Sequence, residues 1–155
     1  MKKLLLASVL SIVPAILLAQ VTVADPWVRA TVPAQKATGA FMQLTSKTDA
    51  RLIDASSPGL RTEIHEMAVQ DNVMRMRQLD SLALPAGKTV ELKPGGYHIM
   101  FFDVKNQIKE GDVIPLTLVF ENKDKKRETV ELKVPARSLN NAMPATPAAK
   151  RHSGH

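Results

Sequence analysis

The stretch LKPGGYHIMFFD, residues 92–103, decides the fold. A Pro-Gly-Gly turn precedes a run of aromatic and branched apolar residues, a combination typical of a β-strand. Successive side chains of a strand point to opposite faces, so Ile99 and Phe101 share one face. His98 and Met100 share the other. We expect Ile99 and Phe101 to face a hydrophobic core, and His98 and Met100 to point away from it.

The same period-2 alternation recurs from Val21 onward, in short segments bounded by Pro, Gly, Asn and Asp, and no segment has helical periodicity. The predicted strands are Val21–Ala30, Thr38–Ser46, Arg51–Ser56, Arg61–Val69, Val73–Leu79, Thr89–Leu92, Tyr97–Asp103, Ile114–Phe120 and Arg127–Val134. About nine short strands with turns between them predict an all-β two-sheet sandwich or Greek-key barrel. A parallel α/β fold is excluded, because it would need helices between its strands.

The length of 155 residues suits one domain, which we assign to residues 20–135. Residues 136–155 are rich in Pro and Ala, contain two histidines and lack an apolar period. We therefore expect a disordered tail there.

The N-terminus resembles a secretory signal peptide over residues 1–19. Lys2 and Lys3 precede an apolar run that ends at Leu18, and the small residue Ala19 marks the expected cleavage point. The alternative is a membrane anchor, but the run is shorter than the roughly 20 residues that a span requires, and Pro14 interrupts it. No later segment is apolar enough to cross a bilayer. We expect an exported protein, which in a bacterium means a periplasmic one.

Charge and cysteine content exclude several classes of function. The formal net charge of +6 falls to about +4 once the two leader lysines are removed, and the basic run Lys123–Arg127 lies between two predicted strands as a hairpin turn. No basic stripe with aromatic residues is present, so nucleic acid is not expected as a partner. The chain contains no cysteine. Disulfides and blue-copper electron-transfer sites, which need a thiolate, are therefore excluded.

Histidine and methionine form three pairs with the spacing i, i+2. The pairs are His65 with Met67, Met74 with Met76, and His98 with Met100. Each pair lies on one face of a predicted strand. A short turn between the first two strands predicts a hairpin, and the third pair must arrive by longer-range pairing.

These donors favour copper(I). Thioethers are neutral and soft, and imidazole adds a stronger donor without adding charge, whereas calcium and magnesium prefer charged oxygen ligands. For any one of these methionines, a role as core filler is the more common explanation. The joint pattern favours a metal site.

The spacing His65-x10-Met76-x21-His98-x-Met100 resembles the motif of the PCu(A)C-type periplasmic copper chaperones. The resemblance extends over roughly residues 21–134, including the segments DPWVRA, ATGAFM, LKPGGYHIM and EGD. It implies a cupredoxin-like β-sandwich that binds one copper(I) through those four residues.

The resemblance also implies a role. Members carry copper(I) to the dinuclear copper site of cytochrome c oxidase subunit II, together with Sco-type thioredoxin-like proteins. Met67 lies where some members have a methionine, and we count Met67 and Met74 as auxiliary donors. Some members bind a second copper with a C-terminal extension, and Met143, His152 and His155 lie in such a tail.

The sequence leaves three alternatives open. A copper-buffering or resistance protein would use the same ligands without a dedicated acceptor. A hydrolase would combine His65 or His98 with Glu66 or Asp103, but no catalytic motif accompanies them, and we expect no enzyme. A structural or adhesion module would not need the histidines and methionines at all.

Overall fold

The computed structural model describes residues 19–138, which contain ten β-strands and no helix. The strands are β1 (Val21–Arg29), β2 (Thr38–Ser46), β3 (Ala50–Ser56), β4 (Arg61–Gln70), β5 (Val73–Leu79), β6 (Leu82–Leu84), β7 (Thr89–Leu92), β8 (Tyr97–Phe102), β9 (Val113–Asn122) and β10 (Arg127–Arg137). The predicted all-β class is confirmed. The short β6 was not predicted, because three residues before Pro85 are too few for an alternating pattern.

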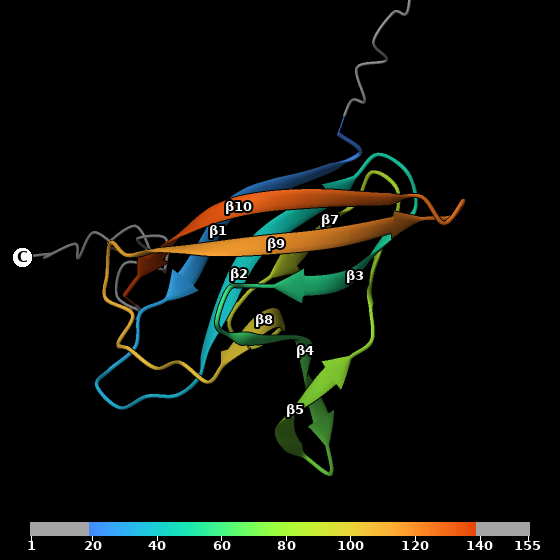
Figure 1. Cartoon of the computed structure of the whole chain (residues 1–155). Helices are drawn as coiled ribbons and strands as arrows, with labels where there is room; N and C mark the ends of the chain where they lie inside the picture. Colours follow the sequence, from blue (N-terminus) through green and yellow to red (C-terminus); the bar gives the residue numbers. More distant parts are fainter. Residues whose placement is uncertain (1–18, 139–155) are drawn as a thin grey trace, which may run out of the picture.

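The strands form a nearly closed barrel with the order β5-β4-β8-β7-β2-β1-β10-β9-β3-β6. The parallel pairing of β1 with β10 joins two layers, one containing β2, β4, β5, β7 and β8, the other β3, β6 and β9. The long β9–β10 hairpin crosses one side of the molecule, and the β4–β5 hairpin projects from the opposite end (Figure 1).

The inner faces of the two layers enclose one hydrophobic core. Ile99 and Phe101 of β8 are fully buried there, together with Leu44 of β2 and Leu118 and Phe120 of β9. The predicted inward direction of the apolar side chains of β8 is therefore confirmed.

A tight turn sets the register of the projecting hairpin. Asp71 and Asn72 both have positive φ, 52° and 61°, the conformation of a two-residue type I′ turn, which matches the twist of paired strands. This turn places Met67 directly opposite Met76. A second turn precedes β8, where Gly95 has a φ of 83° that a residue with a side chain rarely adopts.

β4 lies inside the sheet between β5 and β8, and β5 is the edge strand. One strand boundary differs from the sequence prediction. The strand expected to end at Val134 continues to Arg137, because Val28 and Arg29 of β1 pair with Ala136 and Arg137.

In residues 19–138 there is no helix with the length and hydrophobicity needed to cross a membrane. The expected signal peptide falls outside the described residues, apart from Ala19, and so does the tail from residue 139 onward.

Candidate metal centre

Strand pairing brings the three predicted His/Met pairs to one face of the sheet. His65 of β4 lies opposite His98 of β8, and on the other side of β4, Met67 lies opposite Met76 of β5. Met100 lies two residues beyond His98 on the same face. Side chains from three strands therefore converge, although 17 residues of sequence separate the end of β5 from the start of β8.

His98 has one nitrogen available as a metal ligand. Its Nδ1 lies 3.0 Å from the carbonyl oxygen of Gly96, which can only accept a hydrogen bond, so Nδ1 carries the proton. In the neutral ring Nε2 then has a free lone pair, and it lies 3.1 Å from Sδ of Met76. A thioether sulfur has no proton to donate. Two lone-pair donors that face one another at this distance suit a shared metal ion.

His65 is held by a residue that the sequence analysis missed. Its Nε2 lies 2.7 Å from a carboxylate oxygen of Glu63, while its Nδ1 is buried without a hydrogen-bonding partner. Buried polar atoms are normally satisfied, so an orphaned nitrogen indicates an absent ligand or a functional role. Glu63 stands at i−2 from His65, and the same spacing rule that found the His/Met pairs could have found it.

The candidate ligands differ in exposure. His65, His98 and Met100 are only 7%, 6% and 8% exposed, whereas Met76 is 48% exposed. His98 and Met100 do point away from Ile99 and the core, as predicted, but they are not open to solvent. The cover over His98 comes in part from Phe41 of β2, which the sequence pattern of β8 alone does not reveal.

A row of rings provides this cover. Trp27 packs on Phe41 at a centroid distance of 4.6 Å, and Phe41 lies 6.4 Å from His98. The His98 ring lies 5.8 Å from that of His65, which lies 5.9 Å from Phe102. The two histidines are thus held between aromatic side chains from β2 and β8.

Burial lowers the pKa of His98 below its ordinary value, and the nearby positive charge of Arg29 acts in the same direction, against the hydrogen bond to Gly96. A buried imidazole is costly to protonate. His98 is therefore held in the neutral form that a metal requires.

The other residues considered earlier lie outside this cluster. Glu66 pairs with Arg77, and Asp103 pairs with Arg61 at 3.5 Å.

Met74 is half exposed on β5, opposite Val69 and one pair further from the histidines than Met76. The tail residues Met143, His152 and His155 lie outside the described residues.

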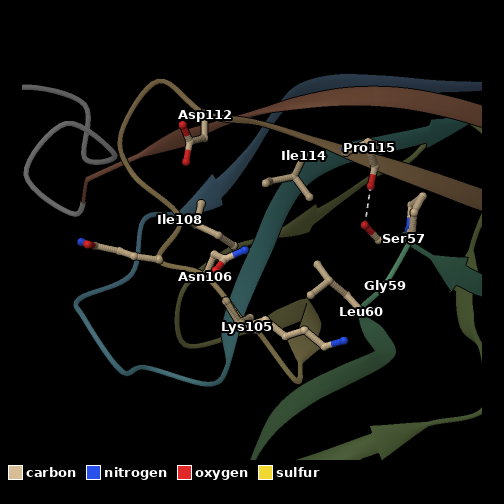
Figure 2. A pocket seen from close by; sticks show the side chains of 12 residues that line it. Ser57, Gly59, Leu60, Lys105, Asn106, Ile108, Asp112, Ile114 and Pro115 are labelled. Atoms are coloured by element: carbon tan, nitrogen blue, oxygen red, sulfur yellow. Dashed lines mark hydrogen bonds between the residues drawn. The ribbon is translucent and has the colours of Figure 1, made fainter.

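Among residues 19–138, no group of three or more His, Cys, Asp and Glu residues could hold a metal ion. A hollow of about 340 Å³ lies between the turn after β3 and the loop before β9 (Figure 2). It contains no histidine, and the Ser57 hydroxyl inside it donates to the carbonyl of Pro115 at 2.6 Å.

Two sequence comparisons place the chain among lipoprotein-like relatives. The family model "Putative lipoprotein LpqE-like" matches residues 21–136. A Leifsonia xyli protein named "Putative lipoprotein" is 30% identical over 104 residues, 66% of this chain and 63% of the relative. An uncharacterised Rickettsia prowazekii protein is 31% identical over 117 residues, 71% of this chain and 64% of the relative. The matched regions span less than two thirds of each curated relative.

Solved structures share the fold. The copper-bound PCuAC domain from PmoF2 matches with a TM-score of 0.58 and 23% identity, over 77% of this chain and 95% of that domain. The CuI form of DR1885 from Deinococcus radiodurans matches with a TM-score of 0.55 and 27% identity, over 79% of this chain and 83% of that one. The chain has the cupredoxin-like fold of PCuAC-type copper chaperones and belongs to the LpqE-like family.

Proposed function

We propose that this protein binds one copper(I) through His65, Met76, His98 and Met100 and passes it to an acceptor. One observation carries the proposal: Nε2 of His98 lies 3.1 Å from the Met76 sulfur, while the contact of Nδ1 with the Gly96 carbonyl assigns the ring proton to Nδ1. The buried, unpartnered Nδ1 of His65 supplies a second nitrogen on the same face.

The donor set favours the monovalent ion. Two imidazoles and two thioethers are neutral, so no anionic ligand stabilises copper(II), and thioethers select copper(I) over harder metals. Copper also appears in the names of two structures with this fold, the copper-bound PmoF2 domain and the CuI form of DR1885.

Exposure of the ligands supports transfer. Three of them are buried, but Met76 is half exposed on the edge strand β5. An incoming donor from an acceptor can displace the Met76 sulfur first while the buried ligands still hold the ion. A site meant for permanent retention would gain from burying all four.

For the acceptor we propose the dinuclear copper site of cytochrome c oxidase subunit II, with a Sco-type thioredoxin-like protein as companion. This choice rests on the resemblance of the His/Met spacing to the PCu(A)C-type chaperones. The alternative, a copper-buffering protein, uses the same site but has no dedicated acceptor. We place the protein in the periplasm, because residues 1–19 resemble a signal peptide and the relatives are lipoprotein-like.

Anaerobic titration with copper(I) against a competing chelator tests the site. Wild type should bind one tight equivalent, which both Met76→Ala and His98→Ala should weaken strongly, whereas Met74→Ala serves as a matched control on the same strand. Weak binding that neither site variant changes would contradict the proposal.

A copper transfer assay with the soluble domain of oxidase subunit II then distinguishes a copper chaperone from a copper-buffering protein. Movement of one copper into the dinuclear site supports the chaperone. Retention against that acceptor supports buffering.

A further inference from the structure

Glu63 lies on the same face of β4 as His65 and opposite Met100 of β8. Its side chain is only 18% exposed, and its two carboxylate oxygens contact different groups, Nε2 of His65 and the guanidinium of Arg61. A carboxylate so close to soft ligands could serve as a ligand or as a support for one.

The hydrogen bonds identify the proton on each imidazole. The ionised carboxylate of Glu63 only accepts, so Nε2 of His65 carries the proton and Nδ1 is the free lone pair. In His98 the arrangement is reversed, since Nδ1 donates to the carbonyl of Gly96 and Nε2 is free. The free nitrogens are the two that lack an oxygen acceptor: Nδ1 of His65 has no partner, and Nε2 of His98 faces the Met76 sulfur.

We propose that Glu63 is a positioning residue that holds His65 in the Nε2–H tautomer, so that His65 binds copper(I) through Nδ1 while His98 binds through Nε2. This inference rests on the proposed function and goes beyond it by assigning the ligand atoms and a supporting residue. Carboxylates that orient metal-binding histidines in this way fix the ring and raise the basicity of the ligand nitrogen.

The surroundings keep Glu63 in the supporting position. Arg61 contacts the carboxylate and also lies 4.1 Å above the ring of Phe102, which packs beside His65. Asp103 also contacts this guanidinium, at 3.5 Å from its Nε. With one oxygen on Arg61 and the other on His65, the carboxylate does not have to enter the ligand set. The ligands remain neutral, which favours copper(I).

Long-range proton–nitrogen NMR correlation of the histidine rings in the metal-free protein provides the first test. Wild type should show His65 with the proton on Nε2 and His98 with the proton on Nδ1. Glu63→Leu should abolish the preference in His65 and leave His98 unchanged, which also reports that the variant is folded. Glu63→Gln should restore the preference, because its amide oxygen accepts the same hydrogen bond.

Copper(I) loading provides the second test. In wild type, the nitrogen resonances that shift most should be Nδ1 of His65 and Nε2 of His98. Glu63→Leu should weaken copper(I) binding about 10- to 100-fold, the usual effect of losing such a partner, and Glu63→Gln by less. Glu66→Gln is the matched control, because it removes the same charge from β4 at a residue that pairs with Arg77 instead.

The outcomes of these tests distinguish a failure of the positioning role of Glu63 from a failure of the proposed copper function. A largest shift at Nε2 of His65 on loading would overturn the positioning role while leaving the copper site intact. Equal affinities for wild type and Glu63→Leu would also overturn it. Absence of copper(I) binding in wild type would refute the proposed function, whereas the tautomers in the metal-free protein would still show whether Glu63 orients His65.

Discussion

Strands β8 and β5 both donate to the proposed centre, but they occupy different environments. β8 lies inside the sheet between β4 and β7, with Ile99 and Phe101 in the core and His98 and Met100 buried on the opposite face. β5 is the edge strand of the projecting hairpin, and its Met74 and Met76 are 50% and 48% exposed (Figure 1).

This difference distinguishes ligands that retain the copper ion from a ligand that an acceptor can replace. Side chains on β8 are fixed by packing on both faces, so their replacement disturbs the fold as well as the ligand set. The side chains of β5 from Val73 to Gln78 are exposed, so we expect replacement of Met76 to change the ligand set with little effect on the fold. A carrier needs both kinds of ligand, because it must bind the ion firmly and still release it to an acceptor.

The largest expected contrast is between the two methionine ligands. Met100→Ala should lower the free energy of unfolding by about 2–5 kcal/mol, the usual cost of truncating a buried methionine, and should weaken copper(I) binding. Met76→Ala should change the free energy of unfolding by no more than about 0.5 kcal/mol, yet also weaken copper(I) binding. Urea unfolding of the metal-free variants, paired with chelator competition, measures both quantities. Equal losses of stability would remove the distinction between the strands.

A smaller effect is expected at Gly39 of β2, which pairs with Met100. A Cβ at Gly39 would lie 2.9 Å from the ring tip of Phe41, so Gly39→Ala should displace a ring that covers His98. We expect a loss of about 1–3 kcal/mol, as in other overpacked sites. Urea unfolding measures the loss, and the His98 ring resonances should move. Unchanged stability and unchanged resonances would show that Phe41 does not constrain β8.

The stability of the folded protein should also depend on pH, because His98 is buried. The pKa of His98 is lowered in the folded protein, mainly by burial, so at acidic pH the unfolded chain binds a proton that the folded chain does not. The contribution of His98 to stability is therefore complete above the unfolded pKa of about 6.5 and declines as the pH falls below it.

Urea unfolding of the metal-free protein at several pH values measures this dependence. His98→Gln should reduce the slope of stability against pH in the acidic range. An identical slope in the variant would mean that another group is responsible.

The smallest effect is expected at Met74. It shares the residue type, strand and exposure of Met76, but it pairs with Val69 rather than with Met67. Met74→Ala should therefore leave one tight copper(I) equivalent, measured by the same chelator competition. A loss as large as that of Met76→Ala would make Met74 a ligand and extend the site toward the hairpin tip.

Much of the fold could be predicted from the sequence, because alternation and turn residues are local signals. The pattern of β8 gave the face of each side chain, and the Asp71-Asn72 turn gave the β4–β5 hairpin. The pairing of β4 with β8 could not be derived locally, since it joins residues distant in sequence. The burial of His98 was missed because its cover, Phe41, belongs to β2 and is itself packed against Trp27 of β1.

X-ray absorption spectroscopy of the copper-loaded protein, prepared under anaerobic conditions, identifies the ligand atoms. We expect copper(I) bound by two nitrogen and two sulfur ligands, with one sulfur lost in Met76→Ala and one nitrogen lost in His98→Ala. Nitrogen and oxygen ligands alone, or a spectrum that neither variant changes, would contradict the proposed His/Met site.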